Sequence, residues 1–406
     1  MRMSERVVIV GAGQGGLQVA ASLRGDGFGG TVTLVGDEPG LPYQRPPLSK
    51  AYMMDGDDSR LALKPASFFP ANDIDYRPAT IVAAIDRQAG TVVLDGGGTL
   101  PFDHLVLATG ARNLRPAMPG LDLPGVHELR GLADATRLRA ALAGARQVAV
   151  IGGGFIGLEF AAVAAAAGRP VTVIEAAGRL MARAVTPPMS RRFLDFHRNA
   201  GVDLRLDTLG QGIAGSTAAE GVALAGGGTV AADLVLLAVG VRPNVELAAR
   251  AGLPVANGIV VDGHLRTEDP RIFAIGDCAS FPLDGAATRL ESVQAAVDHA
   301  RHVARTITGA EQPPYGALPW FWSDQGPLKL QIAGLSGGWD DTHVLTGDGG
   351  AVDTVFVFRA DRLIAVETVN QAGRHMAARR LLSGPPLTRD RLDRAGWDLR
   401  ALLARG

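Results

Sequence analysis

The chain has 406 residues, more than one ordinary domain holds, so its length predicts two or three domains. Hydrophobic residues make up 47% and charged residues 20% of it, a composition that supports a large buried core and excludes extensive disorder. Lys and Arg number 40 against 41 Asp and Glu, for a net charge of -1. This balance argues against a nucleic-acid partner, because such partners require a basic surface.

A single cysteine, Cys278, is present. One thiol excludes an internal disulfide, a CxxC redox pair and any iron–sulfur or metal site made of cysteines alone. The eight histidines show no HxH or HExxH spacing, so no metal site is predicted. The apolar run Val7–Val10 stops at Gly11, and glycine, proline or charge interrupts every later apolar run. We therefore expect a cytoplasmic protein that has no membrane partner.

The first strong motif follows the run Val7–Val10. It reads Gly11-Ala12-Gly13-Gln14-Gly15-Gly16 and precedes a helix of small residues (17–23), an apolar strand (31–35) and Asp37. In such a GxGxxG fingerprint the first glycine allows a tight turn, the second lets backbone approach a pyrophosphate, and the third lets the helix pack on the strand. The phosphates meet the helix N-terminus and the acid accepts hydrogen bonds from a ribose. This segment predicts a dinucleotide site.

The same arrangement returns in the middle of the chain. The strand Val148–Ile151 leads into Gly152-Gly153-Gly154-Phe155-Ile156-Gly157, followed by a helix (158–167), an apolar strand (171–174) and Glu175. Two dinucleotide units in one chain predict two different ligands. The natural pair is a bound flavin and a diffusible nicotinamide cofactor.

Two buried-strand patterns that end in glycine, 105–110 and 234–240, would each complete the sheet of one half. A short strand at 271–277 precedes a helix that begins near Val293. The alternating segments 352–358 and 363–369 predict antiparallel strands.

The predicted fold class is α/β, with two Rossmann-like dinucleotide-binding domains and a C-terminal α+β domain that ends in arginine-rich helices. The predicted boundaries are 1–112 with 247–319 for the flavin half, 113–246 for the nicotinamide half, and 320–406 for the C-terminal domain.

Three further segments carry a resemblance. They are Pro42-Tyr43-Gln44-Arg45-Pro46-Pro47-Leu48-Ser49-Lys50, a Thr267–Ala279 segment that closes on Gly276-Asp277-Cys278-Ala279, and Pro319-Trp320-Phe321-Trp322-Ser323-Asp324-Gln325. With these segments, essentially the whole chain resembles the glutathione-reductase-like flavoproteins. The closer match is to the oxygenase-coupled NADH–ferredoxin reductases of the putidaredoxin-reductase type. The resemblance implies FAD as the bound cofactor and NADH as the electron donor.

The resemblance also implies which residues would contact FAD. These are Gly11, Ala12, Gly13 and Gly16 at the pyrophosphate, Asp37 at the adenosine ribose, Val82 and Arg130 on the adenine side, Arg45 and Lys50 against the flavin, and Asp277 at the ribitol chain. Val293, at a helix start, would offer its N–H to the pyrimidine end of the flavin, where the positive end of the helix favours the reduced ring. Trp320 would either stack in the flavin region or belong to the core.

The implied NADH site uses Gly152, Gly154, Gly157, Glu175, Arg183 and Gly240. A carboxylate at Glu175 would accept hydrogen bonds from the ribose hydroxyls and repel the extra phosphate of NADPH. Arg183 is close enough in sequence to accommodate that phosphate in part, but NADH is favoured. Glu159 would face the nicotinamide and pair with Lys50, and these two form the candidate catalytic pair. The alternatives are that Arg45 and Lys50 lie in a solvated loop and that Glu159 is a surface helix residue.

The electron acceptor is inferred from what the chain lacks. Disulfide reductases of the resembled superfamily need a cysteine pair, and its peroxide- or oxygen-reducing members need a cysteine near position 42, where this chain has Leu41, Pro42 and Tyr43. We expect an external one-electron acceptor, a 2Fe–2S ferredoxin that serves an oxygenase such as a haem-thiolate monooxygenase. Between 374 and 406, eight Arg face three Asp, a net of +5 that would suit an acidic partner unless it is only a solvated surface.

Two other functions stay open from the sequence. One is a redox-sensing protein that resembles apoptosis-inducing factor, and the other is a rubredoxin reductase. Family members of the resembled type are monomers or weak homodimers, and the same is expected here.

Overall fold

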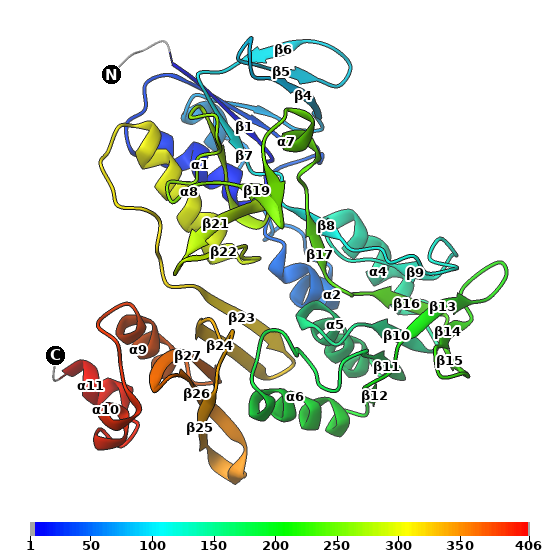
Figure 1. Cartoon of the computed structure of the whole chain (residues 1–406). Helices are drawn as coiled ribbons and strands as arrows, with labels where there is room; N and C mark the ends of the chain where they lie inside the picture. The colour runs from blue at the N-terminus through cyan, green and yellow to red at the C-terminus, as the bar shows by residue number, and fades with distance from the viewer. Residues whose placement is uncertain (1–4, 405–406) are drawn as a thin grey trace. The chain divides into compact units, whose positions relative to one another are not determined.

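The computed structural model describes residues 5–404 (Figure 1). The chain forms two compact units. The first takes in the described part of Met1–Gln44, together with Asp58–Arg112 and Val241–Ala317. The second takes in Arg45–Asp57, Asn113–Gly240 and the described part of Leu318–Gly406. The three-domain boundaries expected from the sequence stay a prediction.

A five-stranded parallel sheet forms the centre of the first unit. Its three central strands are almost continuously apolar and buried, as parallel strands covered on both faces must be. In spatial order they are β20 (Ile272–Ala274), β7 (His104–Leu107), β1 (Arg6–Val10), β2 (Thr31–Val35) and β3 (Ile74–Arg77). The predicted strand at 105–110 thus lies directly beside the first fingerprint strand, with Val8 opposite Leu105.

Two helices of the first unit, α1 (Gln14–Gly25) and α8 (Val293–Ile307), pack against each other beside this sheet (Figure 1). The remaining elements are short. They are α3 (Phe68–Ala71), α7 (Glu246–Arg250), the 3-10 turn η2 (Gly276–Cys278), an antiparallel sheet of β4 (Val82–Asp86), β5 (Thr91–Leu94) and β6 (Thr99–Pro101), and a sheet of β18 (Val255–Ala256), β19 (Gly258–Val260), β21 (Ala279–Leu283) and β22 (Ala286–Thr288). Strands β8 (Ala111–Asn113) and β17 (Val241–Pro243) form a two-stranded sheet.

The second unit repeats the parallel-sheet plan. In spatial order its strands are β12 (Asp203–Arg205), β11 (Val171–Ile174), β10 (Val148–Ile151), β16 (Leu234–Leu237) and β9 (Val126–His127). Its other elements are η1 (Pro46–Ser49), α2 (Ala51–Asp55), α4 (Leu132–Gly144), α5 (Phe155–Ala166), α6 (Pro187–Asn199), and an antiparallel sheet of β13 (Gly210–Ala214), β14 (Gly221–Leu224) and β15 (Thr229–Ala231).

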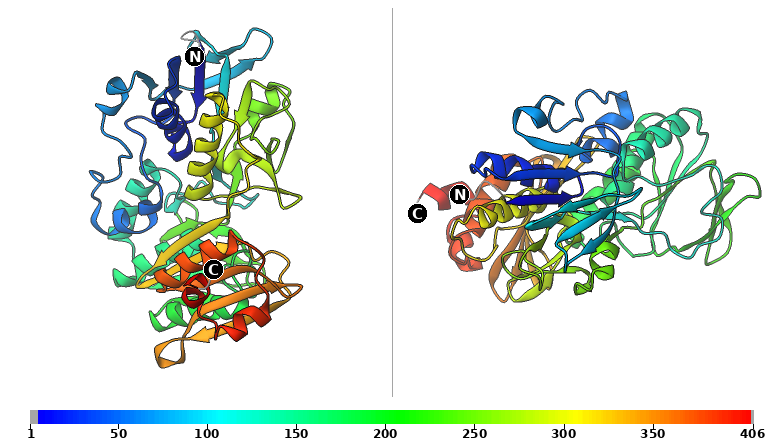
Figure 2. Two further views of the ribbon diagram at one scale, coloured as in Figure 1. Left: turned by 90° about the vertical axis from the view of Figure 1, so that its left-hand side faces the viewer. Right: turned by 90° about the horizontal axis from the view of Figure 1, so that it is seen from above.

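The second unit also contains the C-terminal sheet and its helices. The strands, all antiparallel, run in the order β23 (Trp320–Gln325), β24 (Leu328–Gly334), β27 (Arg362–Val369), β26 (Val352–Arg359) and β25 (Asp341–Thr346). Figure 2 shows α9 (Ala372–Leu382), α10 (Arg389–Arg394) and α11 (Leu399–Ala404) grouped beside this sheet, and α9 packs on β24 and β27. A short turn, η3 (Asp348–Gly350), links β25 to β26.

The predicted fold class is confirmed. Each fingerprint lies beside a strand of a parallel sheet. The C-terminal sheet is antiparallel at the segments where alternating apolar and polar residues predicted antiparallel strands. The fingerprint helices begin earlier than expected, at Gln14 and Phe155, because the glycine run itself supplies the first helical turn. Among residues 5–404, none of the helices has the length and hydropathy needed to span a membrane.

The first unit buries two histidines, His299 and His302, on α8 next to Tyr315. Burial lowers the pKa of His299 to about 3 and that of His302 to about 4, since an imidazolium loses its hydration there. At His302 the nearby His264 and Arg305 act in the same direction, while Asp262 opposes them.

These lowered values predict acid-sensitive folding. A histidine that is neutral when folded and protonated when unfolded stabilises the fold above pH 6.5, and this stability is lost as the pH falls towards the folded pKa. The free energy of unfolding of the wild type should therefore fall between pH 6 and pH 5 by about 1.2 kcal/mol more than that of His302→Gln. Urea unfolding of both proteins at each pH measures this difference. The protonation of groups that the two proteins share contributes equally to both and cancels. Parallel pH profiles would contradict the assignment.

Candidate functional site

The first fingerprint forms the connection between β1 and α1. Gly11 has a φ of +107°, and a Cβ there would lie 2.2 Å from the carbonyl oxygen of Ala108. A Cβ on Gly16 would lie 1.9 Å from the carbonyl oxygen of Gly11, so the helix packs directly on the strand. Gly13 is different, because no atom among the described residues lies within 4 Å of the position its Cβ would take. The space in front of Gly13 is open, as a pyrophosphate needs.

The second fingerprint has the same geometry. Gly152 has a φ of +108°, and a Cβ there would lie 2.3 Å from the carbonyl oxygen of Ala238. A Cβ on Gly157 would lie 2.3 Å from the carbonyl oxygen of Gly152. At Gly154 the space is again open within the part of the chain described. Gly13 and Gly154 immediately precede α1 and α5, and neither helix start is capped by a side chain of residues 5–404. Both helices therefore offer N–H groups that fit a dinucleotide phosphate.

The two acids after the second strands are not equivalent. Glu175 directly follows β11, where its carboxylate accepts the N–H of Gly153 at 2.6 Å and that of Ala177 at 2.7 Å. The strand registers pair Val10 with Val35 and Ile151 with Ile174, so the counterpart of Glu175 in the first unit is Gly36. Asp37 lies one residue further on and is exposed. The Cβ of Ala12 lies 2.6 Å from the place a Cβ on Gly36 would take, which leaves no room for an acid there.

Arg183 and Gly240, two further candidates for the NADH site, lie together. Gly240 follows β16 with a φ of +114°, and its Cβ would lie 3.4 Å from Nη2 of Arg183. The guanidinium of Arg183 is thus placed beside the end of a parallel strand, where ligands of open α/β sheets bind.

The Arg45–Lys50 segment forms a short 3-10 helix that its two prolines favour. Arg45 donates through Nη1 to the carbonyl oxygen of Arg130 at 2.9 Å, so two candidates for the FAD site are in contact. Lys50 donates through Nζ to the carbonyl oxygen of Pro46 at 3.1 Å. Both cations have protein partners and are not part of a free solvated loop.

Lys50 also pairs with Glu159, as the family resemblance implied. Its Nζ lies 2.8 Å from Oε2 of Glu159, and Glu159 is only 4% exposed. The alternative of a surface carboxylate is wrong. Two serines that sequence reasoning missed complete the cluster, because Ser49 donates to Oε2 and Ser323 donates to Oε1 at 2.7 Å. A buried carboxylate needs such a set of donors.

Asp277 lies in the turn η2, next to the start of α8. The helix begins at Val293, as predicted, and Ser292 caps it by accepting the N–H of Ala295 at 3.0 Å. The N–H of Gly276 donates to Nδ1 of His299 at 3.2 Å, a contact within the first unit that no sequence motif indicated. His299 therefore fixes the backbone just before Asp277.

Val82 and Trp320 have clear structural surroundings. Val82 is the buried first residue of β4. The ring of Trp320 lies 4.3 Å from the guanidinium of Arg379 and 5.9 Å from the ring of His375, both on α9. Trp320 thus packs within the C-terminal domain, and a role at the cofactor stays a prediction.

Cys278 has no place in redox chemistry. The side chain is fully buried, with Sγ 3.2 Å from the carbonyl oxygen of Ile275 and 3.4 Å from that of Leu107. Burial raises the pKa of the thiol, which keeps it protonated and unreactive.

The arginine-rich C-terminal segment is less basic than its sequence indicates. Arg374 pairs with Asp353 at 3.0 Å, Arg389 pairs with Asp341, and Arg394 pairs with Asp390. Arg405 lies outside the described residues. Carboxylates of β25 and β26 therefore offset part of the +5 charge expected for 374–406.

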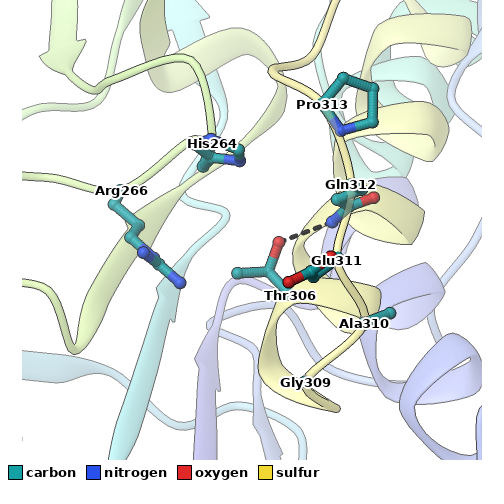
Figure 3. A pocket seen from close by; sticks show the side chains of 8 residues that line it. All are labelled: His264, Arg266, Thr306, Gly309, Ala310, Glu311, Gln312 and Pro313. Atoms are coloured by element: carbon teal, nitrogen blue, oxygen red, sulfur yellow. Dashed lines mark hydrogen bonds between the residues drawn. The ribbon is translucent and has the colours of Figure 1, made fainter.

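A surface pocket of the first unit lies elsewhere. Figure 3 shows His264 and Arg266 across from the segment after α8, where Gln312 donates to Thr306 at 2.6 Å. The pocket is lined by His264, Arg266, Thr306 and residues 309–313, and includes none of the candidate cofactor residues.

Comparisons with known proteins agree with this geometry. The model of the pyridine nucleotide-disulphide oxidoreductase family matches residues 5–300, and a reductase C-terminal model matches 320–403. Rhodocoxin reductase of Rhodococcus erythropolis is 50% identical over 98% of this chain and 94% of its own length. Putidaredoxin reductase of Pseudomonas putida is 41% identical over 91% of this chain and 90% of its own.

Among solved structures, a ferredoxin reductase for the CYP199A2 system from Rhodopseudomonas palustris has a TM-score of 0.94. It is 44% identical and covers 98% of this chain and 99% of its own. The putidaredoxin reductase of a covalent complex with putidaredoxin also has a TM-score of 0.94, at 38% identity over 99% of this chain and 98% of its own.

The open space at Gly154 predicts a selective defect. An added methyl group meets no described atom of the protein, so Gly154→Ala should fold and keep its flavin, yet it should raise the KM for NADH by roughly tenfold or more by blocking the pyrophosphate. Steady-state kinetics measure this change. The matched control is Gly144→Ala at the end of α4, where the space is also open. Equal KM values for Gly154→Ala and the wild type would contradict the assignment.

Proposed function

We propose that this chain, which belongs to the pyridine nucleotide-disulphide oxidoreductase family, carries electrons from NADH through FAD to a 2Fe–2S ferredoxin that serves an oxygenase. The observation that carries the proposal is the pair of fingerprints, each with an open second glycine at an uncapped helix start among the described residues. Such sites hold dinucleotides, and two of them let one cofactor reduce the other.

When bound, FAD would take a hydride from NADH and release the two electrons one at a time. The residues proposed to bind and orient FAD are Gly11, Ala12, Gly13, Gly16, Asp37, Arg45, Lys50, Val82, Arg130, Asp277 and Val293. Those proposed for NADH are Gly152, Gly154, Gly157, Glu159, Glu175, Arg183 and Gly240. Glu159 would hold the Lys50 ammonium in place against the flavin through their 2.8 Å ion pair.

The cysteine content supports an external acceptor. The one cysteine is buried, so this chain offers no dithiol that could take the electrons internally. Two relatives at 41% identity are named as ferredoxin–NAD(+) reductase components of oxygenase systems, the p-cumate 2,3-dioxygenase system of Pseudomonas putida and the anthranilate 1,2-dioxygenase system of Burkholderia cepacia. An oxygenase system is therefore the proposed destination of the electrons.

A rubredoxin is the second candidate acceptor. Rubredoxin-NAD(+) reductase of Pseudomonas putida is 39% identical over 90% of this chain, nearly as similar as the ferredoxin reductases at 41%. A cytoplasmic location and a monomeric or weakly dimeric state stay predictions from the sequence.

The function is tested with purified flavin-loaded protein under anaerobic conditions. About one equivalent of NADH should bleach the flavin. With NADH in excess, catalytic amounts of the protein should then reduce putidaredoxin, used as a 2Fe–2S probe, faster than they reduce rubredoxin. Faster reduction of rubredoxin would favour the second candidate. A flavin that NADH leaves oxidised, or a reduced flavin that transfers to neither carrier, would contradict the proposal.

The position of Glu175 leads us to expect that it sets the preference for NADH over NADPH. Glu175→Gln keeps an acceptor oxygen for Gly153 or Ala177 but removes the charge that repels a ribose phosphate. The ratio of kcat/KM for NADH over NADPH should fall by roughly tenfold, which corresponds to the free energy of about one charge-assisted hydrogen bond. Glu220→Gln, the same change at an exposed position of the second unit, should leave the ratio unchanged. An unchanged ratio in Glu175→Gln would show that the ribose binds elsewhere.

A further inference from the structure

A buried chain of polar side chains leads to Glu159 from the C-terminal domain. Ser323 and Gln325 on β23 and His197 on α6 are each 0% exposed, and all of them belong to the second unit with Glu159. Ser323 Oγ lies 2.7 Å from Glu159 Oε1, Gln325 Nε2 lies 3.3 Å from Ser323 Oγ, and His197 Nε2 lies 2.8 Å from Gln325 Oε1. The proposed function uses none of the three.

The direction of every hydrogen bond in this chain is fixed by chemistry. An ionised carboxylate only accepts, so Ser323 must donate to Glu159, and the hydroxyl oxygen is left to accept from the amide of Gln325. The amide oxygen of Gln325 then faces His197, which must donate through Nε2. Burial lowers the pKa of His197, which keeps the ring neutral, and the contact with the amide oxygen of Gln325 places its one proton on Nε2. Three donors in series therefore point towards the carboxylate of Glu159.

The strand geometry places these donors. Ser323 and Gln325 are two residues apart on β23, so their side chains point to the same face of the sheet. On the same face, the ring of Phe321 lies 4.6 Å from that of Phe155 at the start of α5, which seats the strand against the helix that carries Glu159. Gln325 also donates to Met181 Sδ at 3.5 Å, so both protons of its amide are used.

We propose that Ser323, held by Gln325 and His197, is a positioning residue for Glu159. By occupying Oε1 it leaves Oε2 for Lys50 and Ser49, and so fixes where the Lys50 ammonium lies. The inference rests on the proposed function, in which Lys50 lies against the flavin and Glu159 faces the nicotinamide. It adds that the C-terminal domain supplies part of the hydride-transfer geometry.

The test is the rate at which NADH bleaches the flavin of the holoenzyme in anaerobic stopped-flow experiments. Ser323→Ala removes the donor and should lower the limiting rate roughly tenfold, about the worth of one hydrogen bond to a charged group, while the NADH concentration at half-maximal rate changes little. Ser323→Thr keeps the hydroxyl and should restore most of the rate. Gln325→Met should cause a smaller loss, because Ser323 can still donate without its support.

The matched control is Ser336→Ala. Ser336 is another serine of the C-terminal domain, half-buried where Ser323 is fully buried, and its hydroxyl donates to the carbonyl oxygen of Ala184 at 3.3 Å and not to Glu159. Its limiting rate should equal that of the wild type. If Ser323→Ala does not fold, Ser323→Cys, with a weaker donor of similar size, carries the test and should be slower than both the wild type and Ser323→Thr.

The outcomes separate the two ideas. A wild-type rate in Ser323→Ala or Ser323→Cys, or a Ser323→Thr variant as slow as Ser323→Ala, would overturn the positioning role while the reductase function stands. A wild-type flavin that NADH leaves oxidised would instead overturn the proposed function.

Discussion

The desolvation of one carboxylate organises much of the second unit. Glu159 is almost fully buried on an Ala-rich helix, and an uncompensated charge there would be too costly to keep. Its partners come from two other parts of the chain: Ser49 and Lys50 near the N-terminus, and Ser323 in the C-terminal domain. Each partner is needed because burial has removed water as an alternative. A charge at this point therefore requires the three segments to meet.

In both nucleotide-binding folds, the turn from the first strand into the helix leaves no room for a side chain, and both folds have glycine there. At Gly11 and Gly152 a carbonyl oxygen of the neighbouring strand connection lies where a side chain would begin, so only glycine lets the strand turn into its helix. The folds differ at the position after the second strand. In the first unit Ala12 approaches Gly36, whereas in the second unit the absence of a side chain at Gly153 leaves room for Glu175. One backbone plan thus accepts an acid in one half and excludes it in the other.

How far the sequence predicts this structure depends on the range of each interaction. The fingerprints are local, because turn, helix start and close packing all follow from glycines a few residues apart, and the apolar runs mark the strands of the parallel sheets. The sequence shows that Asp37 follows its strand one residue later than Glu175 does, but not the approach of Ala12 to Gly36 that excludes an acid at the equivalent position. Ser323 and Glu159 are 164 residues apart, and nothing in the sequence near either one indicates the other. The Lys50–Glu159 pair was predictable only through the family resemblance.

The C-terminal domain contributes buried polar side chains to the interior of the second unit, among them Ser323, Gln325 and Glu367. Ser323 reaches Glu159 on α5, and Glu367 on β27 accepts both the N–H of Thr186 at 2.8 Å and its hydroxyl at 2.7 Å, at the start of α6. Burial raises the pKa of Glu367 to about 7, although the donors of Thr186 oppose the rise. Both contacts fall on helices that flank the proposed NADH residues. A change in the C-terminal sheet would therefore alter the position of the proposed NADH residues even when no carrier protein is bound.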